Sequence, residues 1–293
     1  MILIKSSFEI LDQIPSIDGI YRQIELTGRV SYKSEDKITE DSVKKFVDML
    51  IKRGYTSCLE HGTVYLKLDD NTYKSIFNKD NEKWNTFINK YKTNPYSTVT
   101  NNYYDVYITS NYRVLYQNNW LDDLQYLCEP TEYHEKRITV KFILPIFISR
   151  EFSYFSPDKF NNELTFIIPY WADLKEARYQ FWDNDWVDAT DKNKIPDTIL
   201  KHFEGDSTDI FLSQCESAEV NYKALINRGC KAQEASEILP LCTKTELIMT
   251  KTVEQWKKFF KLRTSITAHP QIRELAISLK EEFIKRNLLD GND

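Results

Sequence analysis

Proton transfer is the first chemistry that the sequence suggests, because Glu60 and His61 are neighbours in the stretch TSCLEHGTVYL. A carboxylate and an imidazole can exchange protons near neutral pH. The two residues stand where a helical segment turns into a strand, and a single pair in such a place is more often structural than catalytic. We therefore interpret Glu60 and His61, taken alone, as a structural pair.

Two further segments carry charges that could bind an anion. Residues 132–137 read EYHEKR, and we expect a solvated helix end there in preference to an anion anchor. Arg263 ends the apolar helical pattern WKKFFKLR. It could bind a phosphate or cap the helix C-terminus through the macrodipole, and the pattern leaves both interpretations open.

Metal-binding patterns are weak. Acidic clusters occur at residues 183–185 and 188–191, but no histidine or second set of carboxylates frames them, so we expect a solvated surface insertion. The five cysteines are scattered, without a CxxC motif, and are interpreted as free thiols in a reducing cytosol. We expect no metal.

Composition bounds the class of protein. The chain has 293 residues, 41% hydrophobic and 28% charged, which is typical of a folded protein. A net charge of -5 argues against binding to a nucleic acid backbone, although single arginines can still hold a phosphate. Only 7 glycines are present, and neither GxGxxG nor GxxxxGK[ST] occurs, which excludes the usual dinucleotide and P-loop sites.

The sequence also predicts a location. It shows no signal-peptide pattern and no apolar run near the roughly 18 residues of a membrane helix, so we expect a cytoplasmic protein without a membrane partner. Its richness in Asn, Lys, Ile and Tyr indicates an AT-rich coding source, bacterial or viral, for instance a phage.

Hydrophobic periodicity predicts a mixed α/β protein with one domain over residues 1–293 and a surface insertion at 171–209. Helical spacing predicts helices over 20–26, 41–52, 84–91, 121–127, 210–228, 232–238, 253–263 and 271–286. Alternating or continuous apolar runs predict strands over 62–68, 103–109, 137–148, 163–169 and 246–250.

Taken in order, several segments together resemble one family, the flavin-dependent thymidylate synthases of the ThyX type. The segments that carry the resemblance are ELTGRVSYKSEDKIT (25–39), GYTSCLEHGTVYL (54–66), NYRVL (111–115), EPTEYHEKRITVKF (129–142), AQEASEILP and TKTELIMT (within 232–250), and WKKFFKLRTSITAHPQIREL (256–275). No single segment would suffice, but the ensemble covers nearly the whole chain.

The resemblance implies a homotetramer with a mixed sheet and flanking helices, FAD at the subunit interfaces, and methylation of dUMP with methylenetetrahydrofolate and NADPH. It also assigns site residues. The positions that match nucleotide-binding residues of the family are Arg113, Arg150, Glu151 and Arg263, and those assigned to the cofactor are Tyr55, Glu60 and His61.

One block of the family is missing. In the family, a strand ending like ISREF runs into Arg-His-Arg, a spaced serine and Ser-x-Arg-Tyr before a segment like DKFNNELTFIIP. Here Phe152 is followed directly by Ser153 in ISREFSYFSPDKFNNELTF. Tyr55 also replaces a histidine, and Ser236 replaces an arginine that helps to hold dUMP.

These departures suggest a ThyX-like protein with a degenerate active site. We hypothesise an inactive homologue that has lost FAD and binds a nucleotide or a nucleotide-derived signal in the cleft between subunits. One alternative is an active FAD-dependent thymidylate synthase with a shifted site. A second alternative is a structural or protein-interaction role of the oligomer.

Overall fold

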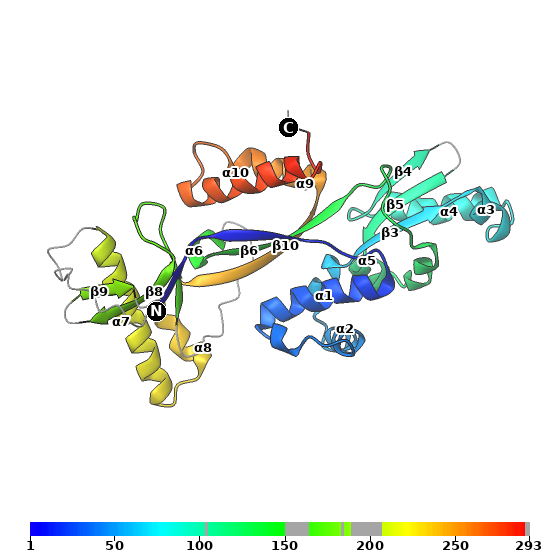
Figure 1. Ribbon diagram of the computed structural model, residues 1–293. Coiled ribbons are helices and arrows are strands. Elements are labelled where there is room, and N and C mark those ends of the chain that lie inside the picture. Colours follow the sequence, from blue (N-terminus) through cyan, green and yellow to red (C-terminus); the bar gives the residue numbers. More distant parts are fainter. Residues whose placement is uncertain (103–104, 150–163, 183–184, 189–206, 291–293) are drawn as a thin grey trace. The chain divides into compact units, whose positions relative to one another are not determined.

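The computed structural model describes residues 1–102, 105–149, 164–182, 185–188 and 207–290 (Figure 1). The chain divides into two compact units. Unit 1 comprises Met1–Glu9, Lys141–Leu247 and Phe260–Gly291, and unit 2 comprises Ile10–Val140, Ile248–Phe259 and Asn292–Asp293. The single domain expected over residues 1–293 stays a prediction.

Two helices of unit 2 pack closely against each other, α1 (Ile17–Tyr32) and α2 (Ser42–Lys52), drawn in dark blue and in a lighter blue in Figure 1. The Ser16 side chain caps α1 by accepting a hydrogen bond from the Gly19 amide at 3.0 Å. At Gly28 a Cβ would lie only 2.6 Å from the Phe46 ring, so the close approach of the two helices requires glycine there.

The sheet of unit 2 is antiparallel, with the order β3 (Thr63–Leu68), β5 (Asp105–Asn111) and β4 (Thr98–Asn102). Its core comes from one continuous part of the chain, because the buried cluster extends from Ile20 to Tyr126. The other elements around it are the 3-10 turns η1 (Glu35–Lys37), η2 (Thr56–His61) and η3 (Leu121–Tyr126), and the helices α3 (Asp70–Ser75), α4 (Asn81–Lys92) and α5 (Tyr112–Gln117).

A buried charge cluster joins α4 to η3. Asp123, 7% exposed, accepts hydrogen bonds from the Lys90 ammonium at 2.5 Å and the Tyr91 hydroxyl at 2.6 Å. The ammonium also lies 4.1 Å from the Phe87 ring centroid and 5.0 Å from that of Trp120. Such a cluster tolerates burial only while its charges are paired, so Asp123 holds the end of α4 in place.

The four-stranded sheet of unit 1 has the order β7-β1-β8-β9. The bounds of its strands are Thr165–Ile167, Ile2–Ile4, Ala177–Trp182 and Asp185–Asp188. β1 is parallel to β7 and antiparallel to β8. Part of the stretch expected as a surface insertion thus forms a hairpin that extends the sheet, and β1 was not predicted because three residues are too short for a periodic signal.

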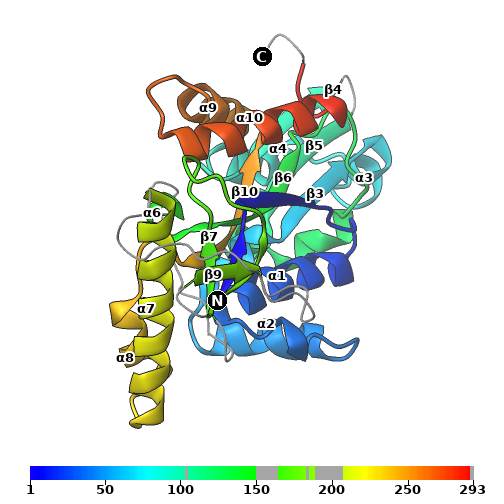
Figure 2. The same cartoon turned by 60° about the vertical axis from the view of Figure 1, so that its left-hand side comes forward.

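The helices of unit 1 include α7 (Ser207–Asn227) and α8 (Ala232–Ala235), which Figure 2 shows beside each other. Unit 1 also contains η5 (Ser236–Ile238), α6 (Ile146–Ser149) and α10 (Pro270–Lys285). Glu219 of α7 is buried and lies 2.9 Å from the amino group of Met1. Its carboxylate also accepts the Leu164 amide at 2.8 Å, which ties α7 to the start of β7.

A third sheet has the order β10 (Lys244–Thr252), β6 (Arg137–Pro145) and β2 (Ser7–Leu11). The strand expected over 137–148 ends at Pro145, because α6 begins at Ile146. The helix α9 (Val253–Arg263) follows β10, with the bounds that the sequence predicted.

The mixed α/β class is confirmed, but the described strands form three small sheets in place of one mixed sheet. The strand expected over 103–109 is β5 from Asp105 onward, since residues 103–104 lie outside the described part of the chain. No helix in the described ranges is long and apolar enough to cross a membrane.

Substitution of Asp123 tests the buried cluster. Asp123→Ala should lower the free energy of unfolding by about 2–4 kcal/mol, because it leaves the Lys90 ammonium without its counter-ion. Asp122→Ala is the matched control, since Asp122 is exposed. Urea titrations of both variants measure the difference, and equal midpoints would contradict the role given to Asp123.

Candidate functional site

The structure brings two of the predicted site residues into contact, Glu60 at the end of η2 and Arg113 in the first turn of α5. Arg113 Nη1 lies 3.2 Å from Glu60 Oε2, and the side chains are 36% and 41% exposed. α5 starts directly after β5 because the Asn111 side chain accepts a hydrogen bond from the Val114 amide at 3.0 Å. This cap places Arg113 beside η2.

The guanidinium of Arg113 is only partly satisfied within the described residues. Its single hydrogen bond there goes to Glu60, and Nε is buried without an acceptor. Arginine presents five donors in a planar fork that suits phosphate and carboxylate groups. The site can therefore offer donors to an anion and, through Glu60, an acceptor to a neighbouring N–H or O–H group.

His61 has a different environment from Glu60. Its Nδ1 lies 2.9 Å from the Thr250 hydroxyl, which is 2.8 Å from that of Thr139. Burial, and to a smaller extent the positive charge of Arg137, lower the pKa of His61 to about 4. Glu60 and His61 therefore do not pair with each other, and a neutral His61 joins η2 to β10.

Arg137 binds the backbone of this site, and the sequence did not predict this role. Its guanidinium donates to the backbone carbonyls of Ser110 at 3.2 Å and Glu60 at 3.1 Å. Its amide donates to the Tyr65 hydroxyl at 3.0 Å. The available signal was an arginine at the first position of the strongest strand, where a charge needs a partner.

The solvated helix end expected over residues 132–137 is wrong. These residues form a turn around His134, which is 5% exposed. Its Nδ1 accepts the Thr131 amide at 3.0 Å, and its Nε2 lies 3.1 Å from the Leu66 carbonyl oxygen. The many charges of the segment concealed a buried histidine that holds the turn to β3.

Tyr55 and Ser236 stand where the resemblance implies a histidine and an arginine, and neither side chain is positively charged. Tyr55 is 48% exposed, and its ring centroid lies 6.1 Å from that of Tyr32. Ser236 donates its hydroxyl to the Gln233 carbonyl at 2.7 Å, within its own helical turn. Neither side chain supplies the positive charge that a phosphate would need.

Three other residues were predicted to bind the nucleotide. Arg150 and Glu151 lie outside the described residues. Arg263 is half-buried at the last position of α9 and belongs to unit 1. This position suits a helix C-cap, and both interpretations of Arg263 stay open.

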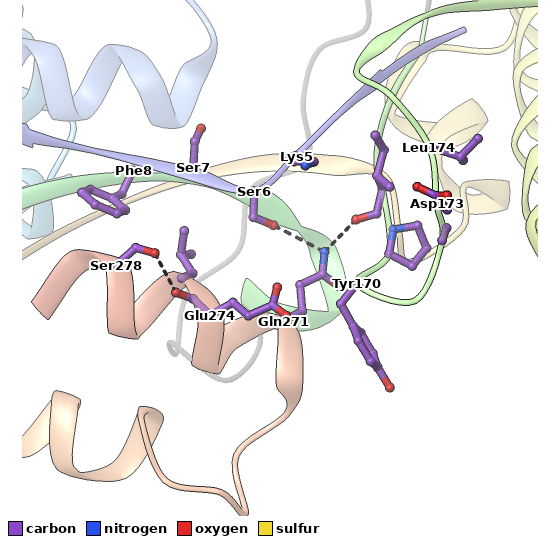
Figure 3. Close-up of a pocket in the computed structure, with 14 residues that line it drawn as sticks. Lys5, Ser6, Ser7, Phe8, Tyr170, Asp173, Leu174, Gln271, Glu274 and Ser278 are labelled. Atoms are coloured by element: carbon purple, nitrogen blue, oxygen red, sulfur yellow. Dashed lines mark hydrogen bonds between the residues drawn. The ribbon is translucent and has the colours of Figure 1, made fainter. Parts of the chain in front are cut away.

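Unit 1 contains a pocket of about 510 Å³ that sequence reasoning missed (Figure 3). Gln271 lies in its wall, with Nε2 donating to the Ile168 carbonyl at 3.1 Å and to the Ser6 hydroxyl at 3.5 Å. The charged residues in the lining are Lys5, Asp173 and Glu274, and two carboxylates against one ammonium do not favour a phosphate. Three distant segments form this pocket, so no local spacing could predict it.

A second, smaller pocket of about 230 Å³ in unit 1 has a largely aromatic lining. Its wall includes Phe147, Trp171 and Phe211, together with His269 and Cys242. In the described part of the chain, no group of three or more His, Cys, Asp or Glu side chains could hold a metal ion. The acidic clusters at 183–191 lie outside the residues whose side chains are described.

Residues 108–286, more than half of the chain, match the family described as thymidylate synthase complementing protein. Flavin-dependent thymidylate synthases are similar over shorter segments. The enzyme of Pyrococcus furiosus is 42% identical over 66 residues, 22% of this chain and 27% of that protein. The enzyme of Pyrococcus abyssi is 35% identical over 68 residues, 23% and 28% of the two chains.

The aligned part of the chain therefore spans only about a quarter of the length of these curated relatives. Among solved structures, a UMP/dUMP methylase, PolB, from Streptomyces cacaoi bound with 5-Br UMP is similar. The two sequences are 14% identical. The structural match covers 97% of this chain and 92% of the PolB chain, with a TM-score of 0.38.

The pH dependence of stability tests the environment of His61. The folded pKa of about 4 lies below the ordinary 6.5, so the unfolded chain binds more protons between these values. His61 should therefore contribute to the free energy of unfolding above pH 6.5, and this contribution is lost as the pH falls towards 4. For a ring with some exposure, the loss is on the order of 2 kcal/mol. Urea titrations across this range should show a steeper loss in the wild type than in His61→Asn.

Both proteins keep His134, so the difference between their slopes isolates His61. Parallel slopes would show that His61 titrates normally in the folded protein.

Proposed function

Since the chain belongs to the family of thymidylate synthase complementing proteins, we propose that it binds a nucleotide or a nucleotide-derived signal without methylating it. The main support for this proposal is that Ser153 directly follows Phe152, where the resemblance implies a block rich in arginine. That block would place cations on the cofactor and the nucleotide together. A chain without it keeps the scaffold but not the catalytic constellation.

The free energy that the missing arginines would contribute to the transition state is large enough to support inactivity. A preorganised donor that stabilises developing charge typically contributes about 3–4 kcal/mol to a transition state. Groups that act as a unit fail together when part of the unit is removed. Losing the block and the arginine replaced by Ser236 should therefore reduce turnover by many orders of magnitude.

The ion pair of Glu60 and Arg113 supports retained binding. An exposed ion pair contributes only about 0–1 kcal/mol to folding, so stability gives little reason to keep it. The unsatisfied donors of Arg113 suit a phosphate or a carbonyl oxygen of a base, and Glu60 suits an imide N–H or a ribose hydroxyl. His61 and Arg137, by contrast, have structural partners that an inactive protein also needs.

The residues assigned to the cofactor do not fit FAD. Its diphosphate requires cations or free backbone amides, whereas Tyr55, Glu60 and His61 present a phenol, a carboxylate and a neutral imidazole. Nδ1 of His61 already lies at the Thr250 hydroxyl. We therefore propose a colourless protein whose oligomer, a tetramer by family resemblance, binds nucleotides in the cleft between subunits.

The visible spectrum of the purified protein tests the loss of FAD. We expect no flavin absorbance in the visible range, before or after incubation with FAD and gel filtration, because the missing cations leave the diphosphate unpaired. Bound flavin together with NADPH oxidation in the presence of dUMP would instead support the active synthase. Absence of both flavin and nucleotide binding would support the structural role of the oligomer.

Calorimetry against dUMP, UMP and adenine nucleotides tests the binding role of Arg113. We expect Arg113→Gln to weaken binding of the preferred nucleotide about 10- to 100-fold, since it removes charge-assisted hydrogen bonds worth about 1.5–3 kcal/mol. Arg22→Gln is the matched control, because Arg22 of α1 also forms an exposed ion pair, with Asp18 at 2.6 Å. Equal affinities of the two variants would contradict a site at Arg113.

A further inference from the structure

Two of the free thiols lie close together in unit 1. Cys215 is fully buried in α7, and Cys242 is half-buried in the turn before β10. Their Sγ atoms are 3.9 Å apart, within about 2 Å of the separation in a disulfide. We propose that Cys215 and Cys242 are an oxidation site, at which a peroxide forms a disulfide that links α7 to the turn before β10.

The surroundings assign different roles to the two thiols. Cys242 lines the smaller pocket, which gives a small oxidant a route to its sulfur, whereas Cys215 has no exposed surface. A hydrogen bond from the Cys215 thiol lowers the pKa of Cys242, and burial raises that of Cys215. Cys242 is thus the sulfur that meets the oxidant, and Cys215 is the resolving thiol.

The chemistry balances with hydrogen peroxide as the oxidant. The Cys242 thiolate attacks one peroxide oxygen and the O–O bond breaks, which gives a sulfenic acid and a hydroxide that takes up the thiol proton as water. The Cys215 sulfur then attacks the Cys242 sulfur and displaces a second water, which carries the proton of Cys215. Each sulfur loses one electron, and the peroxide gains two.

The backbone around Cys242 is held in the position that the reaction needs. Its carbonyl accepts the Ile167 amide at 3.0 Å, and the carbonyl of Thr243 accepts the Ile146 amide at 3.0 Å. The Thr243 hydroxyl also donates to the Pro240 carbonyl at 2.6 Å. Rotation of the two cysteine side chains, with a small shift of α7, can therefore close the remaining gap.

Peptide mapping of the oxidised wild-type protein tests the proposal. The reduced protein is treated with hydrogen peroxide, alkylated with iodoacetamide after unfolding, and digested with trypsin. Because each thiol lies in its own tryptic peptide, we expect one linked species that joins residues 202–223 to 232–244. The other three cysteines should be alkylated, including Cys230 in the separate peptide 229–231.

Cys230→Ser is the matched control, because Cys230 packs against the same hydrophobic cluster and should not affect the link. In Cys215→Ala, Cys242 should stop at the sulfenic acid, which dimedone labels. Alkylation of Cys215 and Cys242 as complete as that of Cys230, or a link to Cys230 instead, would overturn the proposal. The wild-type map decides the question even where Cys215→Ala does not fold.

Discussion

The half-buried side chain of Arg137 makes the interaction on which the arrangement of unit 2 depends. It bridges the backbone of η2 and the end of β5 through the carbonyls of Glu60 and Ser110. A guanidinium shielded from water needs protein acceptors, so separation of these two elements would leave its donors without partners. With its carbonyl held, Glu60 directs its carboxylate outward to Arg113, and His61 keeps a ring that is neutral at physiological pH.

Local patterns predicted most helices but few features that depend on distant contacts. The bounds of α9 and nearly those of α10 follow from apolar residues at helical spacing. β1 and β8 could not be predicted in this way, because each is stabilised by pairing with a strand far along the chain. The turn around His134 shows the same limit, since its burial depends on Leu66 and not on its charged neighbours.

The residues of the candidate site are present for different physical reasons. His61 and Arg137 have partners within the protein, so the fold alone explains them. Glu60 and Arg113 lie near the surface and contribute little to stability, so their presence requires a different explanation. The sequence predicted both residues by resemblance, but only the structure distinguishes Glu60, which faces Arg113, from its neighbour His61, which faces Thr250.

The discontinuity of unit 1 bears on the order in which the chain can fold during synthesis. One large hydrophobic cluster of unit 2 comes from residues between Ile20 and Tyr126, so the sequence of that cluster leaves the ribosome as one uninterrupted stretch. β1 precedes this cluster in the chain but pairs with β7 and β8, which begin at Thr165 and Ala177. β1 must therefore wait without its strand partners until β7 and β8 are translated.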